Sequence, residues 1–305
     1  MTGAGGGLGR AHALLLASHG AKVVVNDLGA GRDGEGGSRS AAERVADEIR
    51  ALGGEAVANS ASVTDGHEVE RMVEGALSRW GRVDILVNNA GILRDKTFAK
   101  IALEDFRAVI EVHLMGSVNC TKAVWETMRS QKYGRIIFTT SSSGLYGNFG
   151  QSAYATAKMA MVGLMNTLHL EGEKYGIRVN CLSPSAATRM TDDIMDANML
   201  GMLDPRLVAP AVLALAAPDA PSRIILCAGA GSFERAHVSL TKGLFLGEGA
   251  KVAQKILEKL PAISDPKDEM RPEAGPLQAK YEMDMRTRSL MPDGCPDGGN
   301  GNEGA

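Results

Sequence analysis

The chain has 305 residues, of which 44% are hydrophobic and 23% charged, and its formal net charge is −3. It contains no apolar run near the ~18 residues of a membrane span, no basic-then-apolar leader pattern and no basic block, so we expect no membrane span, no secretory signal and no nucleic acid as main partner. The four cysteines are far apart and form no CxxC, which favours a reduced compartment and argues against a bound metal.

Short apolar runs rich in β-branched residues alternate along the chain with segments of helical periodicity. Because the runs are apolar at consecutive positions, they predict strands that are covered on both faces. The order indicates an α/β fold, a doubly wound (Rossmann-like) parallel sheet with helices on both faces. The expected strands are 22–26, 56–58, 83–87, 135–139, 178–182 and 223–227, and the expected helices are 8–19, 38–52, 68–80, 103–128, 152–174 and 205–217.

The end of the chain has a different composition. Pro, Gly, Asp and Asn dominate the last 14 residues, and such a segment buries too little apolar surface to offset its ordering entropy. We therefore expect one α/β domain over 1–262 and a mostly disordered tail over 263–305, with a short helix near 277–285.

Residues 2–9 read TGAGGGLG and lie directly before an expected helix. Gly3, Gly7 and Gly9 would let the backbone turn tightly and approach a pyrophosphate, which the amino-terminal end of the helix attracts. A flexible terminus has a similar composition, so the loop alone is weak evidence. The next expected strand ends in Asp27, whose carboxylate can accept hydrogen bonds from ribose hydroxyls and repel a 2′-phosphate. This predicts NAD rather than NADP, although Arg32 nearby could approach a phosphate.

A second group of polar residues follows later in the chain. Tyr154 and Lys158 are four residues apart, so on a helix they share one face, and Ser141 precedes Tyr154 by thirteen residues. An ammonium beside the phenol is expected to lower the pKa of Tyr154, which could then act as a general base toward an alcohol or as an acid in reverse. Ser141 would bind the substrate oxygen, with Ser142 and Ser143 as alternatives.

Taken together, TGAGGGLG, the NNAG of 88–91 and the Ser141, Tyr154 and Lys158 spacing resemble the short-chain dehydrogenase/reductase family over about 2–240. Within it, VVVNDLG, NNAGILRDKTFAK, KYGRII, SGLYGNFGQSAYATAK and TRMT resemble the (3R)-hydroxyacyl-CoA dehydrogenase module of peroxisomal multifunctional enzyme type 2 and its bacterial single-module relatives.

The resemblance implies an NAD-dependent oxidoreductase that moves a hydride between a secondary alcohol, a (3R)-hydroxyacyl-CoA, and the nicotinamide. It implies that Lys158 also holds the nicotinamide ribose, and that two or four copies assemble through 103–128 and 152–174. A steroid-like or other hydrophobic alcohol is an alternative substrate, and a truncated non-catalytic homologue is a further alternative. The implied cofactor residues are Gly3, Gly7, Leu8, Gly9, Asp27, Asn89, Ala90, Gly91, Tyr154, Lys158, Pro184 and Thr188.

Three positions depart from the family pattern. His113 stands where the family has an Asn that relays protons to the lysine; a relay role and simple helix packing are both open. Ala61 replaces an Asp that contacts adenine in many relatives, with Ser62 as a possible substitute. Ser185 replaces a Gly after Pro184, and a positive φ there would be costly for Ser.

Two further segments bear on the substrate. The segment 188–203 is rich in Met, which suits a lid over a fatty acyl chain, although ordinary helix packing explains it as well. Arg94, Lys96 and Lys100 follow the NNAG motif and are candidates for contacts to CoA phosphates.

The fold that the motifs predict begins with an apolar strand before the glycine loop, yet only Met1 precedes Thr2. We therefore expect ten or more residues to be missing upstream, and a gap or distortion in the middle of the sheet. The final residues are not a peroxisomal SKL-type signal, so the expected location is the cytoplasm.

Overall fold

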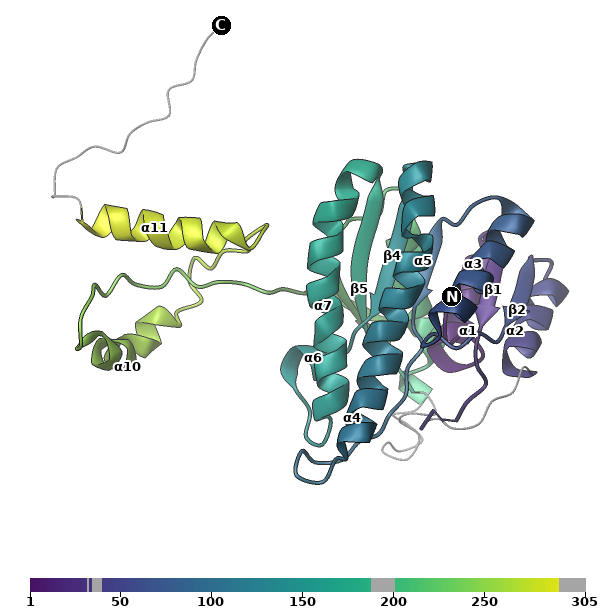
Figure 1. Ribbon diagram of the computed structural model, residues 1–305, viewed down its shortest axis with the longest axis horizontal. Coiled ribbons are helices and arrows are strands. Elements are labelled where there is room, and N and C mark those ends of the chain that lie inside the picture. The colour runs from purple at the N-terminus through teal and green to yellow at the C-terminus, as the bar shows by residue number, and fades with distance from the viewer. Residues whose placement is uncertain (32, 35–39, 188–200, 291–305) are drawn as a thin grey trace, which may run out of the picture. The chain divides into compact units, whose positions relative to one another are not determined.

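The computed structural model describes residues 1–31, 33–34, 40–187 and 201–290 (Figure 1). It divides into two compact units, Met1–Ala236 and His237–Ala305. This division falls earlier than the boundary expected at 262/263. The second unit contains α10 (Val252–Ile263) and α11 (Pro276–Leu290), neither of which buries a residue, and the short helix expected at 277–285 lies inside α11.

The first unit is built on two sheets. The first has two parallel strands and the second has five, in the order β3-β4-β5-β6-β7. All pairs are parallel except β6 and β7, so the sheet dominated by parallel strands is confirmed. The strands are β1 (Val23–Asn26), β2 (Ala56–Asn59), β3 (Ile85–Asn88), β4 (Gly134–Thr139), β5 (Ile177–Ser185), β6 (Ile225–Gly229) and β7 (Ser232–Ala236).

The helices cover both faces of these strands. One layer holds α3 and α5 in mutual contact, with α7 packed on β5; the other holds α1 packed against α9, with α2 over β1 and β2. Figure 1 shows α5 and α7 side by side across β4 and β5. These helices are α1 (Gly7–Ser18), α2 (Ser40–Ala51), α3 (Gly66–Trp80), α5 (Gly116–Gln131), α7 (Ser152–Gly172) and α9 (Ala209–Ala216). Among the described helices, none is both long and apolar enough to cross a membrane.

Two details of the elements differ from the expectation. The single helix expected at 103–128 is α4 (Leu103–Ile110) joined to α5 by the π-helical turn Glu111–Met115, which contains His113. The edge strand β7 was not anticipated. Its residues are mostly exposed, so it lacks the consecutive apolar character that marked the other strands.

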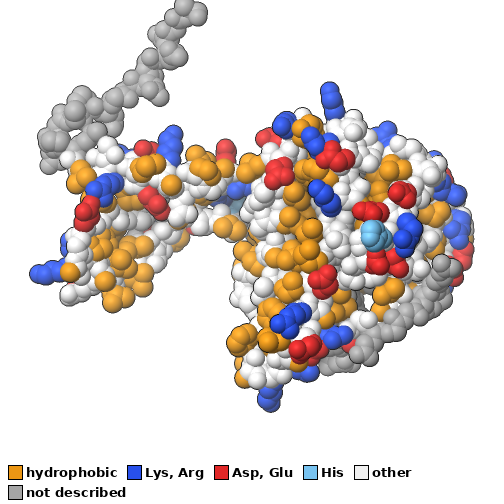
Figure 2. All heavy atoms as spheres, viewed as in Figure 1, with side chains coloured by type: hydrophobic (Ala, Val, Ile, Leu, Met, Phe, Trp, Pro, Cys, Tyr) orange, Lys and Arg blue, Asp and Glu red, His pale blue; other side chains and the backbone are white. Residues whose placement is uncertain are grey.

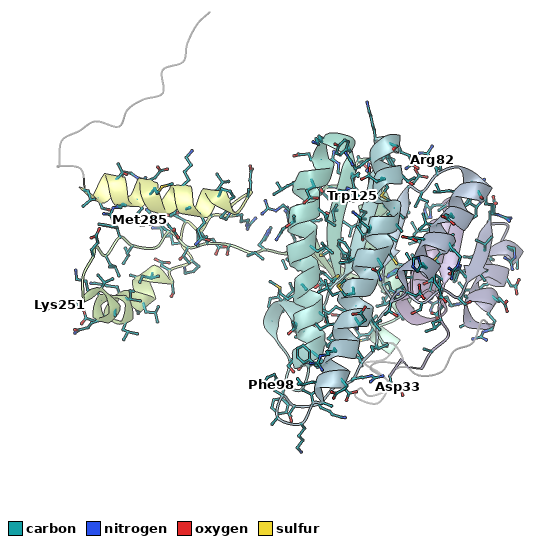
Figure 3. The ribbon with its side chains drawn as sticks, viewed as in Figure 1. Asp33, Arg82, Phe98, Trp125, Lys251 and Met285 are labelled. Atoms are coloured by element: carbon teal, nitrogen blue, oxygen red, sulfur yellow. The ribbon has the colours of Figure 1, made fainter. Side chains whose placement is uncertain are left out.

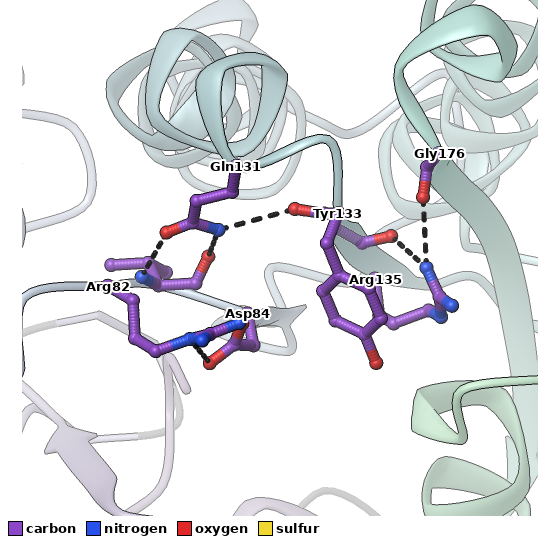
Figure 4. Close-up of polar contacts among 8 residues, drawn as sticks. Arg82, Asp84, Gln131, Tyr133, Arg135 and Gly176 are labelled. Carbon is purple, nitrogen blue, oxygen red and sulfur yellow. Dashed lines mark hydrogen bonds and ion pairs between the residues drawn. The ribbon is translucent and has the colours of Figure 1, made fainter.

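A buried arginine fixes the start of β4 through backbone carbonyls (Figure 4). Arg135 is 3% exposed, donates to the carbonyls of Gly134, Gly176, Ala217 and Pro218, and lies over the ring of Tyr133. Because burial removes its hydration, these carbonyls must supply all its hydrogen bonds. Arg135 therefore joins β4 to the segments that follow α7 and α9.

The segment directly before β3 is fixed by an amide side chain from α5. Gln131 accepts a hydrogen bond from the Val83 N–H at 3.0 Å and donates to the Val83 carbonyl at 2.8 Å (Figure 4). The side-chain amide thus occupies the backbone groups with which a neighbouring strand would otherwise pair.

The first two residues connect the two sheets. The Met1 ammonium donates to the Val24 carbonyl at 3.0 Å, and Asn26 N–H donates to the Met1 carbonyl at 3.0 Å. On the other side, Thr2 N–H donates to the Val87 carbonyl at 3.1 Å. β1 and β3 are not paired with each other and belong to separate sheets, so the gap expected in the middle of the sheet is present.

His12 is buried in α1, and neither ring nitrogen has a hydrogen-bond partner. Burial lowers its pKa to about 4, below the ordinary value of 6.5, so the folded state resists protonation. As the pH falls from about 6.5 to about 4, the unfolded state alone takes up this proton, and stability is lost.

We predict that this difference in protonation lowers the free energy of unfolding by about 3 kcal/mol on acidification. His12→Leu should remove that part of the pH dependence. Urea unfolding at pH 7 and pH 4.5, followed by circular dichroism, measures the difference. The exposed His67→Gln variant is the control and should keep the wild-type slope. Equal acid sensitivity in His12→Leu and wild type would contradict the prediction.

Candidate active site

The glycine loop lies where β1 and β3 end. Gly3 has φ +61°, and a Cβ there would lie 2.8 Å from Ala90 Cα; one on Gly9 would lie 2.1 Å from the Gly3 carbonyl oxygen. Gly7, at φ +50°, begins α1, whose amino-terminal end has no side-chain cap and no acidic residue in its first turn. The loop therefore needs glycine at these positions and leaves the helix end open to an anion.

Asp27 directly follows β1 and faces this loop. One carboxylate oxygen accepts from Gly5 N–H at 2.8 Å and the other from Gly29 N–H at 2.7 Å. A carboxylate has about four acceptor positions, so two remain for further donors such as ribose hydroxyls.

Thr2 joins the glycine loop to the NNAG segment, a role that the sequence reading missed. Its hydroxyl accepts from the N–H groups of Asn89 and Ala90 at 3.0 and 3.1 Å, while the Asn89 side chain donates to the carbonyls of Thr2 and Gly3. Thr2 is 2% exposed. The signal that the sequence offered for this role was a hydroxyl side chain directly before the glycine loop.

Ser141 follows the end of β4 and precedes the short helix α6 (Ser142–Tyr146). Its hydroxyl accepts from Ser143 N–H, and its hydrogen bonding with Tyr154 acts to lower the pKa of the phenol. Ser143 instead donates its hydroxyl to Gln151 at 2.8 Å, and Ser142 is exposed. Of the three serines considered, the contacts favour Ser141.

Tyr154 and Lys158 lie on one face of α7, beside the end of β4. The Lys158 ammonium donates to the Thr139 carbonyl at 2.7 Å and lies 5.5 Å from the centre of the Tyr154 ring. Burial lowers the pKa of Lys158 to about 7. The prediction that Lys158 lowers the pKa of Tyr154 is wrong here, because burial raises it and the Ser141 hydrogen bond only partly offsets that effect.

His113 packs against the same tyrosine. Its ring meets that of Tyr154 edge-on, with centroids 5.3 Å apart, and its Nε2 lies 3.1 Å from the Ile92 nitrogen and 2.8 Å from the Ile92 oxygen. Nδ1 is buried without a hydrogen-bond partner. Burial, with a contribution from Lys158, lowers the pKa of His113 to about 3, so the ring is neutral.

Gly91 explains how this histidine fits. A Cβ on Gly91 would lie 2.2 Å from His113 Cε1, closer than any real Cβ contact allows. The glycine of the NNAG segment therefore provides the space for the ring that supports Tyr154.

Of the three basic residues proposed for CoA, two form ion pairs with a carboxylate and the third is exposed. Arg94 and Lys96 both pair with Asp105, at 2.8 and 3.2 Å, and Arg94 also donates to the backbone carbonyl of Asp33. Lys100 is exposed. Figure 3 shows Asp33 and Phe98 at the same end of the unit, and Phe98 is 78% exposed.

The GNFGQ segment is held by amide contacts. Gln151 donates to Asp95 at 2.6 Å and accepts from Ser143 and Asn148 at 2.8 and 2.9 Å. This network connects the segment before α7 to the loop that follows β3.

Other expected positions lie as follows. Pro184 and Ser185 continue β5 and pair with β6, and Ser185 has no positive φ, so the strain expected there is absent. The Ser62 hydroxyl is hydrogen-bonded to Thr64 at 2.8 Å. Thr188, Arg32 and most of the Met-rich segment lie outside the described residues.

The family model for short chain dehydrogenase matches residues 1–198. The chain belongs to the short-chain dehydrogenase/reductase family. A short-chain type dehydrogenase/reductase of Mycobacterium tuberculosis is 46% identical over 266 residues, which are 87% of this chain and 89% of that protein. Members of this family are oxidoreductases that act on CH–OH groups, and the present chain is one of them.

Multifunctional proteins are also similar. Peroxisomal multifunctional enzyme type 2 of Drosophila melanogaster is 53% identical over 212 residues, 70% of this chain, so the chain matches about a third (35%) of that protein. Its full-length structure superposes with a TM-score of 0.78 at 34% identity, covering 95% of this chain and 49% of that one. A 7α-hydroxysteroid dehydrogenase complexed with NADH has a TM-score of 0.68 at 31% identity, covering 76% of this chain and 92% of that one.

The Thr2 hydroxyl provides a test of how the two loops are held. We predict that Thr2→Val lowers the free energy of unfolding by about 1–3 kcal/mol, because the N–H groups of Asn89 and Ala90 lose their acceptor. Thr2→Ser keeps the hydroxyl and should lose much less. Chemical denaturation of both variants measures the effect, and equal losses would contradict a role for the hydroxyl.

Proposed function

We propose that the chain oxidises a (3R)-hydroxyacyl-CoA to the 3-oxoacyl-CoA with NAD, reversibly. The observation that carries the proposal is the convergence of Ser141, Tyr154 and Lys158 beside the carboxyl end of β4. The similarity to multifunctional enzymes type 2 supports the acyl-CoA substrate.

The residues of the glycine loop fit a dinucleotide. Gly3 and Gly9 leave room that a Cβ would fill, and the uncapped end of α1 suits a pyrophosphate. We propose that Gly3, Gly7, Leu8 and Gly9 hold the pyrophosphate and Asp27 the adenosine ribose. Asn89, Ala90, Gly91, Pro184 and Thr188 complete the proposed site, with Tyr154 and Lys158 at the nicotinamide ribose.

When bound at this site, NAD would supply the acceptor for the hydride that leaves the carbinol carbon. Tyr154 Oη accepts the hydroxyl proton as the carbonyl forms, and Ser141 donates a hydrogen bond to the substrate oxygen. Lys158, with a pKa near 7, is able to change protonation state in the neutral range. Burial disfavours the Tyr154 phenolate that this step requires, and the hydrogen bond of Ser141 partly offsets that effect.

For His113 the contacts favour a positioning role. The neutral ring packs edge-on against Tyr154, and its Nε2 is hydrogen-bonded to the backbone of Ile92. The proton-relay alternative retains one atom, Nδ1, which is free of hydrogen-bond partners.

We also propose that copies of the chain pair through the α5 and α7 face. Figure 2 shows apolar side chains gathered over these helices. Met159 and Leu170 of α7 are 41% and 48% exposed, and Met115, in the turn directly before α5, is 38% exposed.

The mechanism predicts the effect of removing the Tyr154 hydroxyl. Tyr154→Phe should lower kcat by about 10²–10⁴-fold with (3R)-3-hydroxybutyryl-CoA, and NADH affinity should change by less than about threefold. NADH formation at 340 nm and NADH fluorescence titration measure the two quantities. Tyr175→Phe, whose hydroxyl contacts Arg129, is the control.

Full activity of Tyr154→Phe would contradict the mechanism. Assaying the wild type with the (3S) isomer and with a hydroxysteroid tests the substrate class. Turnover of the steroid alone would replace the acyl-CoA proposal with the hydrophobic-alcohol alternative, and no turnover of any substrate would favour the non-catalytic alternative.

Cofactor choice has its own prediction. Asp27→Asn removes the charge that repels a 2′-phosphate, so the ratio of kcat/KM for NADP to that for NAD should rise at least about tenfold. Asp33→Asn, in the same loop, is the control and should leave the ratio near that of the wild type. A tenfold preference of the wild type for NADP would contradict the role of Asp27.

A further inference from the structure

A loop carboxylate is held against the start of the helix that carries Tyr154. Asp95 belongs to the loop that follows β3, and its carboxylate accepts a hydrogen bond from the Gln151 side-chain amide at 2.6 Å. Gln151 directly precedes α7, and its backbone carbonyl accepts the Ala155 N–H at 2.7 Å. Tyr154 lies in this first turn, three residues after Gln151. The contact therefore places Asp95 close to the proposed acid–base residue.

The orientation of this carboxylate is fixed by its surroundings. A Cβ on Gly150 would lie 4.0 Å from the backbone carbonyl carbon of Lys96, so the loop and the start of α7 approach each other closely. The side-chain oxygen of Gln151 accepts from the Ser143 hydroxyl at 2.8 Å, which leaves the amide nitrogen directed at Asp95. Asp95 is thus oriented by an amide whose own orientation is fixed.

The two cations beside Asp95 in the sequence pair with another carboxylate. Arg94 and Lys96 both contact Asp105. Within the part of the chain that the structure describes, Asp95 itself forms no ion pair. Burial is the main cause of the raised pKa of Tyr154, and the negative charge of Asp95 adds to it because it disfavours the phenolate. The field of Asp95 therefore reaches the hydroxyl that contacts the substrate oxygen in the proposed reaction.

The other titratable groups around this hydroxyl lose their charge when buried. The Lys158 ammonium donates to the Thr139 carbonyl and lies 5.5 Å from the centre of the Tyr154 ring, and burial lowers its pKa to about 7. His113, whose ring meets that of Tyr154, is neutral because burial lowers its pKa to about 3. Above pH 7 the charge that acts on the phenol is that of Asp95.

We propose that Asp95 is a specificity-determining residue, which favours substrates whose carboxyl group is esterified over those with a free carboxylate near the carbinol carbon. The proposal rests on the proposed role of Tyr154 in alcohol oxidation. In a 3-hydroxy acid only one methylene separates the carbinol carbon from the carboxyl group, so a free carboxylate would lie near the Tyr154 hydroxyl. There it would be repelled by Asp95, whereas an ester or thioester carries no charge at this position.

The test compares (R)-3-hydroxybutyrate with its methyl ester, which differ at the carboxyl group alone. Asp95→Asn removes the charge and keeps a side-chain oxygen that can accept from Gln151. The ratio of kcat/KM for the acid to that for the ester should rise by about three- to tenfold, because one like-charge repulsion is removed. NADH formation at 340 nm, at a fixed pH of 8, measures both constants.

Glu104→Gln is the matched control. It removes a carboxylate from the first turn of α4, a helix that packs against α7. The Glu104 side chain is exposed and lies 3.8 Å from Arg107, so its charge is directed to solvent. This variant should keep the wild-type ratio of acid to ester.

A binding measurement extends the test beyond turnover. Acetoacetate and its methyl ester are titrated against the NADH complex of Tyr154→Phe, in which turnover is slow, with and without Asp95→Asn, and NADH fluorescence is followed. The ratio of the two dissociation constants should shift toward the acid by a similar factor. A complex that binds neither compound would overturn the proposal, which requires the site to accept the ester.

The proposal is also overturned if the ratio in Asp95→Asn stays at the wild-type value, or if Glu104→Gln raises it equally. Equal losses for acid and ester in Asp95→Asn would show a structural role alone. The compounds contain no CoA, so turnover of (3R)-3-hydroxybutyryl-CoA is measured separately. An enzyme that oxidises the CoA substrate with an unchanged ratio would retain the proposed function and contradict this inference.

Discussion

The hydrogen bonds of Met1 and Thr2 hold the two sheets of the first unit together at the point where the candidate site lies. Their backbone groups join β1 to β3, and the Thr2 hydroxyl fixes Asn89 and Ala90 beside the glycine loop. The proposed adenosine contacts at Asp27 belong to one sheet and the proposed catalytic residues to the other. These bonds therefore contribute to the spacing of the two halves of the proposed dinucleotide site.

Burial governs the electrostatics around Tyr154. It lowers the pKa of Lys158 to about 7 and of His113 to about 3, and it raises the pKa of the phenol. In each case the neutral form is favoured, because an apolar site penalises charge of either sign. Burial thus disfavours the charged forms of both Tyr154 and Lys158 unless a neighbouring group stabilises them.

Most of the fold could be predicted from the sequence because the strands are continuous apolar runs and the helices show clear periodicity. The strand β7 could not, since its exposed residues follow no such pattern. The π-helical turn at His113 was also missed, because the spacing of apolar residues continues through it. Ser141, Tyr154 and Lys158 were identified by spacing and meet in space as expected.

Physical environment was harder to predict than position. The effect of Lys158 on Tyr154 was judged from an expected distance alone, whereas the pKa depends on desolvation, which requires the packed structure. Likewise, the sequence did not indicate that Asp105 would be a partner of the basic residues proposed for CoA. In the structure it pairs with two of them.

That pairing has a consequence for how substrates arrive. With Asp105 between Arg94 and Lys96, this cluster carries one net positive charge instead of two, and its field is screened within a Debye length of about 8 Å at physiological ionic strength. Long-range attraction of an anionic carrier is correspondingly weak. This cluster by itself would then add little electrostatic steering to the approach of an anionic ligand.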